Sequence, residues 1–340
     1  MTPLHEVIIN KNTKINPIWI MRQAGRYLPE FRKIRKINQD FIELCLNEKL
    51  SAEITLQPLK RFNLDGAILF ADILLIPNSM GLKLKFEEGV GPLLETVNNF
   101  HDVEQLHATD QIHKVLNPIY DTVSLVKSKL NKEVTFIGFA GAPWTVATYM
   151  IEGRGSKDHQ KTKVFMASMP DSFDLLISKI VDATTDYLMK QIEAGVEVVK
   201  LFDSWAGSLP GTLVYKYSLE PMKEIAMRIK RSYPHIPVIV FPRGVGPHYE
   251  QFSVINDFDC IALDSNLPLI WAKEKVQINN TVQGNLDPAY LISGGSALIE
   301  EAMKIKEAFS TGGHIFNLGH GITPNAEIKH VECLIDTLKG

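Results

Sequence analysis

The segment DSFDLLISKIVDATTDYLMKQIEAGVEVVKLF, residues 171–202, joins a long amphipathic pattern to a short apolar run. In its first part, Asp171–Ala194, apolar residues recur at helical spacing along one stripe that includes Leu176, Ile180, Ala183 and Tyr187. Gly195 then offers the residue type that most often ends a helix. The run that follows, Val196–Phe202, is short and mainly apolar, which is typical of a strand buried on both faces of a parallel sheet.

Similar apolar runs recur along the whole chain, and each ends in polar or glycine-rich residues. The clearer ones are Gly66–Phe70, Val134–Phe139, Val196–Phe202, Pro237–Phe241, Cys260–Leu263, Thr281–Gln283 and His314–Leu318, with Trp19–Met21 as a weaker eighth. Helical patterns lie between them, among them one opened by Pro221 and those of Ala297–Ser310 and Ile328–Leu338.

About eight alternating strand and helix units favour an α/β fold, a (β/α)8 barrel of the TIM type, as a single domain over residues 1–340. No GxGxxG motif opens a helix after the first strand, which weakens the alternative of a doubly wound dinucleotide-binding sheet. One insertion stands out, because Leu82, Leu84 and Phe86 alternate with charged residues before a Gly-Val-Gly-Pro turn. This pattern predicts a half-buried hairpin on the barrel rim. Residues 152–163, with two glycines and several charges, are a candidate lid.

Composition narrows the class of protein. The chain has 340 residues and a formal net charge of −3, so we expect no general attraction to nucleic acid or to an anionic membrane. The beginning lacks the pattern of a signal peptide, and the most apolar stretch, 137–151, is too short and too interrupted to span a bilayer. Three distant cysteines without a CxxC or His-x-Cys pair predict no disulfide frame and no zinc site, as expected for a cytoplasmic protein.

Polar residues just after the strands are the place to look for an active site, because barrel enzymes build theirs at the carboxyl ends of the strands. In chain order they are Arg22 and Arg26, Asp72, Tyr149, Asp203 and Ser204, Arg243, Asp264, Asn285 with Asp287, and His320. Arginine, aspartate, tyrosine and histidine stand here beside glycine and proline, in segments too apolar for ordinary solvent loops. This set predicts an enzyme that binds an anion and has no metal motif.

The strongest cluster is the segment Arg22, Gln23, Ala24, Gly25 and Arg26, which we take as a candidate substrate-binding segment. Two guanidiniums on either side of a glycine can present donors to carboxylates while the backbone comes close to a ligand. The alternative interpretation is that both arginines lie on a helix surface and are solvated.

Four further residues each have a functional and a structural interpretation. Asp72 directly follows an apolar run, so its carboxylate is costly to bury unless it faces a cation or N–H donors, and a helix N-cap is the alternative. Tyr149 also fits a core aromatic residue, and Ser204 also fits a turn. His320 lies between two glycines that leave its ring accessible. A structural histidine or a phosphate-binding loop is the alternative there.

At these residues the sequence resembles the uroporphyrinogen decarboxylase family, and the match runs nearly from end to end. The segments that carry the resemblance are Trp19–Glu30, Phe70–Leu74, Gly138–Tyr149 with Glu152-Gly153, Phe202–Gly207, Gln283–Pro288 and Asn317–Gly321. The resemblance implies a TIM-type barrel, usually a homodimer, that needs neither a metal nor an organic cofactor.

The resemblance also implies a reaction, the removal of the four acetate carboxyl groups of uroporphyrinogen III as CO2 to give coproporphyrinogen III in haem biosynthesis. Arg22 and Arg26 would hold carboxylates of this tetrapyrrole, and Asp72 would face the pyrrole N–H groups and stabilise a protonated pyrrole. Further contacts to the substrate's side chains would come from Tyr149, Ser204 and His320. The proton donor stays open between Tyr149, His320 and a held water.

Two other functions compete with this one. A cobalamin-dependent methyltransferase of the same superfamily would, by resemblance, hold zinc through a His-x-Cys pair, whereas the corresponding strand end reads Phe241-Pro242-Arg243-Gly244. A non-catalytic tetrapyrrole-binding protein would keep the pocket, but the intact Asp72 beside both arginines argues against it.

Overall fold

A computed structural model describes residues 1–87 and 89–340 of the chain. Its main sheet is parallel and has the strand order β1-β4-β5-β6-β7-β8-β9. These strands are β1 (Gly66–Ile68), β4 (Thr135–Gly141), β5 (Val198–Asp203), β6 (Val238–Pro242), β7 (Cys260–Ala262), β8 (Thr281–Gln283) and β9 (His314–Ile315). Each overlaps a run that the sequence predicts as a strand, so the predicted parallel α/β architecture is confirmed.

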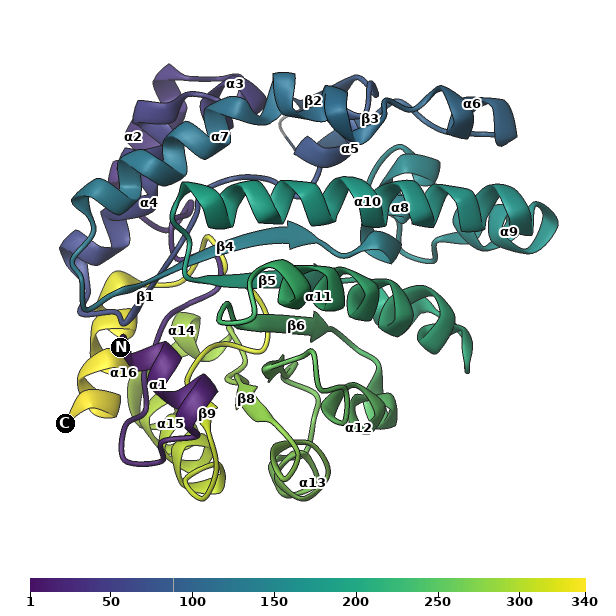
Figure 1. Ribbon diagram of the computed structural model, residues 1–340. Helices are drawn as coiled ribbons and strands as arrows, with labels where there is room; N and C mark the ends of the chain where they lie inside the picture. Colours follow the sequence, from purple (N-terminus) through teal and green to yellow (C-terminus); the bar gives the residue numbers. More distant parts are fainter. Residues whose placement is uncertain (88) are drawn as a thin grey trace.

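Helices surround the sheet (Figure 1), and the first of them in the chain packs against the barrel interior. They are α1 (Pro3–Asn10), α2 (Pro29–Ile37), α3 (Phe41–Cys45), α4 (Glu48–Arg61), α5 (Leu75–Ser79), α6 (Phe100–Gln105), α7 (Thr109–Lys129), α8 (Pro143–Glu152), α9 (Gln160–Ser168), α10 (Pro170–Ala194), α11 (Glu220–Ser232), α12 (Tyr249–Ser253), α13 (Leu269–Ala272), α14 (Tyr290–Ser293), α15 (Gly295–Ala308) and α16 (Ile328–Lys339). The long helix predicted from the opening segment is α10, and it ends at Gly195 with φ 124°. The two termini lie on the side away from the arrowheads of β4 and β6 (Figure 1).

An irregular segment fills the eighth position of the barrel, next to β1 and β9. Ile18 forms a single parallel bridge with Phe316. Its N–H donates to the carboxylate of Asp65 and its C=O accepts from the Asp65 N–H, each at 2.8 Å. The prediction of a strand at Trp19–Met21 is therefore wrong, although the segment occupies the expected place. The difference arises because the N–H groups of Ile18, Ile20 and Met21 donate to side chains, those of Asp65, Gln23 and Asn317, and not to a neighbouring strand.

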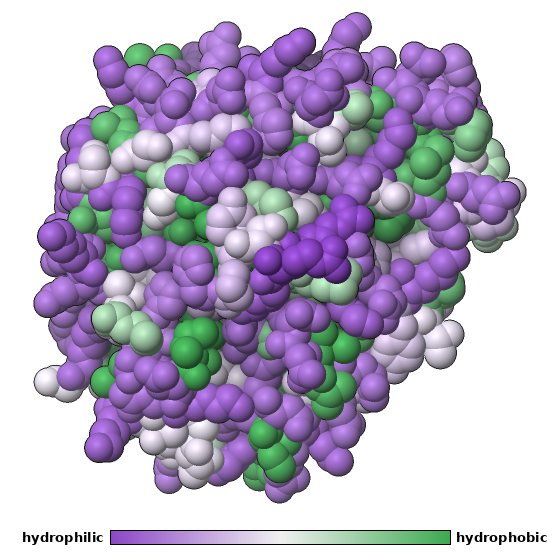
Figure 2. Space-filling model, viewed as in Figure 1, coloured by the Kyte–Doolittle hydropathy of each residue, from purple (hydrophilic) through white to green (hydrophobic). Residues whose placement is uncertain are grey.

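Apolar side chains fill the interior of the barrel. They come from the strands and from the closing segment, and Leu4, Val7 and Ile8 of α1 pack onto them. A second, larger cluster lies between the strands and the surrounding helices. One face of the surface is mostly hydrophilic, with apolar residues in small separate patches (Figure 2). Among the described residues, no helix combines the length and the apolar character that crossing a bilayer requires.

One charged residue, Lys200, points into this apolar interior from β5. It is fully buried, and its Nζ atom lies 5.0, 4.8 and 5.3 Å from the ring centroids of Trp19, Phe202 and Phe241. Its one hydrogen-bond contact in the described part of the chain is the Met21 sulfur at 3.7 Å. Burial lowers the pKa of Lys200 to about 7, and the three rings are the main favourable surroundings for its charge.

The predicted rim hairpin is confirmed. Strands β2 (Leu84–Glu87) and β3 (Gly91–Leu94) pair antiparallel, and the centre of the Phe86 ring lies 4.5 Å from that of the Phe41 ring.

Within the candidate lid, 152–163, the Glu152 carboxylate accepts hydrogen bonds from the N–H and the hydroxyl of Thr162, both at 3.0 Å. The movement of the lid stays a prediction.

Candidate active site

The polar residues named from the sequence follow the strands as predicted. Asp72 comes after β1, Tyr149 lies on α8 behind β4, Ser204 follows β5, and His320 follows β9. Because parallel strands end at one edge of a barrel, these residues share its carboxyl end.

Arg22 is held in place by its neighbours in the chain. Its left-handed backbone costs on the order of 1 kcal/mol, so other contacts must hold it. Gln23 does so, since its Oε1 accepts from the Ile20 N–H and its Nε2 donates to the Gly66 C=O, both at 3.0 Å. A side chain at Gly25 would come within 2.8 Å of the Arg22 carbonyl oxygen. The expectation that Gln23 contacts substrate therefore cannot rest on its side chain, which is fully buried and bonded within the protein.

Arg22 lies at the carboxyl end of the barrel, where it is partly open to solvent, as is Arg26. Burial lowers the pKa of Arg22; the charges of Asp72 and Tyr149 raise it, and those of Arg26 and Arg243 lower it. An arginine nevertheless stays protonated at neutral pH. The five groups are therefore close enough to act on one another, and three of them are cations.

Asp72 combines the two roles that the sequence left open. Its Oδ1 accepts a hydrogen bond from the Leu74 N–H at 2.8 Å, which orients the carboxylate at the start of the next turn. Its other oxygen has no hydrogen-bond donor within the described residues. Burial raises the pKa of Asp72, and the Leu74 N–H and the Arg22 charge lower it. One oxygen is thus structural and the second remains available at the mouth.

Tyr149 connects this carboxylate with the loop after β5. Burial raises the pKa of the Tyr149 hydroxyl, a hydrogen bond with the Trp205 side chain lowers it, the Asp72 charge raises it and Arg22 lowers it. The hydroxyl is therefore protonated at neutral pH and can donate. Trp205 directly follows the half-buried Ser204, so the same contact brings the Ser204 loop toward Tyr149.

His320 reaches the mouth because two glycines allow close approach. A Cβ at Gly319 would collide with the backbone of Ser265, and a Cβ at Gly321 would collide with the side chain of Arg22. Burial lowers the pKa of His320 to about 4, and the charges of Arg22 and Arg243 lower it too. The imidazole is thus neutral at pH 7, where it donates one hydrogen bond and accepts another.

Two aspartates at strand ends organise loops instead. Asp203 is fully buried and accepts from the hydroxyls of Thr145 and Ser218, and burial raises its pKa to about 6. Asp264 accepts hydrogen bonds from the Gly244 N–H (2.7 Å), the Tyr249 hydroxyl (3.0 Å) and the Asn266 N–H (2.9 Å). Residue type and position alone did not separate them from Asp72.

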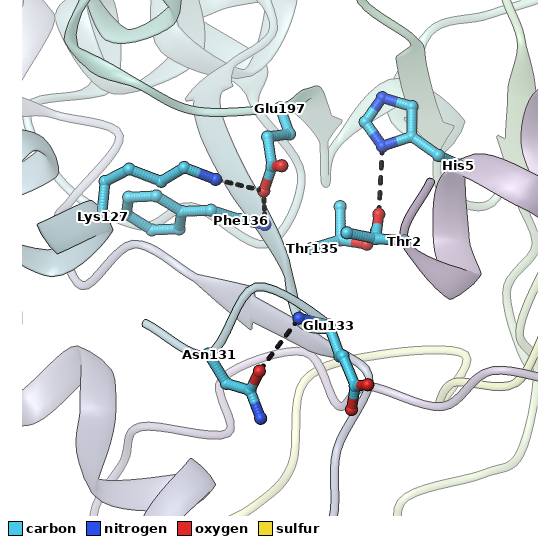
Figure 3. A network of polar contacts seen from close by, with 8 residues as sticks. All are labelled: Thr2, His5, Lys127, Asn131, Glu133, Thr135, Phe136 and Glu197. Carbon is cyan, nitrogen blue, oxygen red and sulfur yellow. Dashed lines mark hydrogen bonds and ion pairs between the residues drawn. The ribbon is translucent and has the colours of Figure 1, made fainter. Parts of the chain in front are cut away.

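A cavity of about 1070 Å³ lies near the amino ends of the strands and the chain's N-terminus. It is larger than the cavity of about 290 Å³ at the carboxyl ends, beside Arg243 and His320. Several polar groups on and beside the wall of the larger cavity are bonded within the protein, as Figure 3 shows for the Lys127–Glu197 ion pair (3.0 Å), the Glu197 bond to the Phe136 N–H (2.9 Å) and the His5–Thr2 contact (3.1 Å). In barrel enzymes this end contributes stability, whereas the chemistry takes place at the opposite end. Size therefore does not identify the active site here.

A parallel α/β barrel with arginines, an aspartate, a tyrosine and a histidine after the carboxyl ends of its strands has the architecture of an α/β-barrel enzyme. The family profile described as "Uroporphyrinogen decarboxylase (URO-D)" matches residues 1–340, and the chain belongs to this family. The proteins named uroporphyrinogen decarboxylase from Ruegeria pomeroyi and Roseobacter denitrificans are 52% and 51% identical to it, over 95% of this chain and 94% of each of them. The resemblance drawn from the sequence is confirmed.

Solved structures support the fold alone. A methyltransferase from Methanosarcina mazei aligns with a TM-score of 0.82 at 15% identity, over 99% of this chain and 97% of that one. A B12-independent methionine synthase from Shewanella sp. aligns with a TM-score of 0.56 at 10% identity, over 87% of each chain. The barrel is thus shared with methyltransferases, while the family is set by the much higher identity to the decarboxylases.

Proposed function

We propose that this chain is a carboxy-lyase that converts uroporphyrinogen III to coproporphyrinogen III, with loss of four acetate carboxyl groups as CO2, in haem biosynthesis. The observation that carries the proposal is the 52% identity to a relative of that name over 95% of the chain. The alternatives of a methyltransferase and of a non-catalytic binding protein have no comparable support.

The charges at the mouth suit such a substrate. Uroporphyrinogen has carboxylates around its whole rim, and Arg22 and Arg26 pair with no carboxylate of the described chain within ion-pair distance. Guanidinium groups bind carboxylates through paired hydrogen bonds of fixed geometry. We therefore assign both arginines to carboxylate binding.

Asp72 supports the chemical step. Loss of CO2 leaves an electron pair on the side-chain carbon, and a pyrrole protonated at a ring carbon accepts it. The available oxygen of Asp72 would stabilise this cationic ring, and its effect is strong where water is displaced. Before protonation the same oxygen accepts only pyrrole N–H hydrogen bonds, so the interaction strengthens in the transition state.

Each acetate consumes one proton overall, because R–CH2–COO⁻ and H⁺ give R–CH3 and CO2. The pKa of His320, about 4, leaves the imidazole neutral in the free enzyme at pH 7, so its N–H can donate a hydrogen bond but the ring is not an imidazolium that could protonate the pyrrole. Arg22 stays protonated. We therefore assign proton delivery to the Tyr149 hydroxyl or to a water that it holds, and His320 to substrate contact as a neutral donor. Ser204 completes the contacts from the β5 loop.

We also propose that the enzyme is a homodimer of the cytoplasm. The dimer follows from the family resemblance, and light scattering of the purified protein tests it. The three cysteines are free, and Cys45 and Cys260 are buried, as expected of thiols kept reduced.

The decisive experiment is anaerobic incubation of the purified chain with uroporphyrinogen III. After oxidation, the porphyrins are separated by their number of carboxyl groups. We expect eight-carboxyl porphyrin to fall and four-carboxyl porphyrin to accumulate, without added metal or cofactor. Recovery of unchanged eight-carboxyl porphyrin from a protein that binds it would instead identify a non-catalytic binding protein.

A further inference from the structure

On the side of β6 and β9 lies a part of the mouth to which the chemistry above assigns only the substrate contact of His320. A cavity of about 290 Å³ opens there, and its wall includes Arg243, Asn266, His320 and Thr323. Arg243 belongs to none of the segments that carry the family resemblance.

The backbone of Arg243 is firmly placed. Its N–H donates to the carbonyl oxygens of Asp203 and Phe241, both at 3.1 Å, and its C=O accepts from the Gly207 N–H at 2.9 Å. The loops after β5 and β6 are in tight contact here, since a Cβ at Gly207 would lie 2.5 Å from the Gly244 carbonyl oxygen. The residue therefore starts from a fixed point at the edge of the cavity.

The guanidinium of Arg243, in contrast, has no protein partner. It makes neither an ion pair nor a side-chain hydrogen bond with the described residues, 1–87 and 89–340. The nearby Asp264 is occupied by three donors from its own and the preceding loop. Asp287, also on the wall, is exposed at the rim, where solvent screens its charge. A half-buried cation without a partner is typical of a site for an anion.

The charged groups that act on Tyr149 and Asp72 differ from those that act on His320. The charges acting on Tyr149 are those of Asp72 and Arg22, and the one acting on Asp72 is that of Arg22. The charges acting on His320 are those of Arg22 and Arg243. Arg243 and His320 also line the same cavity, and Asp72, which we assign to the chemistry, is not among the residues that line it.

We propose that Arg243 and His320 form an anchoring subsite for a carboxylate on a pyrrole ring other than the one that faces Asp72. The inference rests on the proposed function, since it needs a substrate with carboxylates around its rim. Arg243 would supply the charge and the neutral His320 a hydrogen bond, so the macrocycle would be held on one side while an acetate reacts on the other.

Anchoring and chemistry have different kinetic signatures. A carboxylate that does not react is bound equally in the ground state and in the transition state, so its loss raises KM and leaves kcat unchanged. For Arg243→Gln we expect KM for uroporphyrinogen to rise about tenfold or more, the loss of one charge-assisted hydrogen bond. We expect kcat within about twofold of wild type and an unshifted pH profile of kcat. Arg243→Lys keeps the positive charge but loses the paired N–H donors of the guanidinium, so its KM should lie between those of wild type and Arg243→Gln.

The experiment measures kcat and KM for uroporphyrinogen, and the affinity for uroporphyrin, the oxidised macrocycle, by fluorescence. Arg231→Gln, an exposed arginine of α11, is the matched control and should equal wild type. If Arg243→Gln does not fold, Arg243→Met replaces it, since it keeps the apolar stem and lacks the charge.

The outcomes are distinct. Unchanged KM and unchanged uroporphyrin affinity in an active Arg243→Gln variant overturn the subsite, and so does a fall in kcat at constant KM. A wild-type chain that releases no CO2 from uroporphyrinogen contradicts the proposed function instead. Weaker uroporphyrin binding by the variant, with the control unaffected, would then still locate an anion site at Arg243.

Discussion

At Asp72 one carboxylate meets two demands, because its oxygens are used differently. One accepts from the Leu74 N–H and so fixes the orientation of the group. The other remains free to interact with a ligand. A residue that is preorganised by its own turn stabilises charge in a transition state without reorganising first.

We expect Asp72→Asn to fold normally and to lose about 10²-fold or more in kcat, because the amide can still accept from the Leu74 N–H but carries no charge. Turnover of uroporphyrinogen under saturating substrate measures the loss, and circular dichroism checks the fold. Asp40→Asn is the control, since Asp40 caps α3 in the same manner at another place. A variant at position 72 with wild-type turnover would remove this carboxylate from the mechanism.

Residue type and position alone gave an incomplete account of the mouth. The arginines, Asp72 and His320 could be named because they lie in segments that match a family and follow apolar runs. Gln23 lies in the same kind of segment, yet its side chain is bonded to Ile20 and Gly66. Arg243 was visible as a strand-end residue, but its lack of a partner depends on Asp264, 21 positions later in the chain.

Among the elements, the segment that closes the barrel is the most distinctive. It makes only one bridge to Phe316, and Asp65 supplies its bonds on the β1 side. The same Asp65 carboxylate forms an ion pair with Lys339 near the end of the chain, at 2.9 Å. This element carries Arg22, so the closure of the barrel and the geometry of the mouth depend on one short stretch.

We expect Asp65→Ala to lower the free energy of unfolding by about 1 to 3 kcal/mol, because the Ile18 N–H loses its acceptor in a part-buried place. Since the loosened segment carries Arg22, KM should also rise. Urea denaturation and steady-state kinetics measure the two effects.

Asp65→Asn separates the hydrogen bond from the charge. It keeps an acceptor for the Ile18 N–H and loses only the ion pair with Lys339, so we expect a loss below about 1 kcal/mol. Lys339→Ala removes the same ion pair, so we expect it to lower the free energy of unfolding by a similar amount. Equal losses for Asp65→Ala and Asp65→Asn would show that the closing hydrogen bond does not stabilise the barrel.

For the whole molecule, stability should depend on pH through Lys200. Its pKa is about 7 in the folded chain against 10.5 for a free lysine. Between these values the unfolded chain binds more protons than the folded one, so the free energy of unfolding rises with pH. The penalty is fully present below pH 7 and disappears as the pH approaches 10.5. From pH 6 to pH 8 the gain amounts to about 1 kcal/mol.

Lys200→Met tests this, because it fills the same space in the barrel interior without a charge. We expect the variant to be more stable than wild type at pH 6, by a margin that shrinks by about 1 kcal/mol at pH 8. Urea denaturation at both pH values gives the margins. Lys161→Met, on an exposed position of α9, should show no such change. A margin independent of pH would mean that Lys200 keeps an ordinary pKa inside the barrel.

The strand and helix alternation, the rim hairpin and the family could be predicted from the amino-acid sequence, because each depends on a periodicity or a motif of neighbouring residues. Which polar groups lack a partner could be seen only in the folded chain. Asp203 and Asp264 are bonded into loops, Gln23 is bonded to β1, and Arg243 is unpaired beside His320. Pairing between side chains far apart in the chain depends on strand register and on how closely loops approach each other. A pattern of neighbouring residues does not determine these two features.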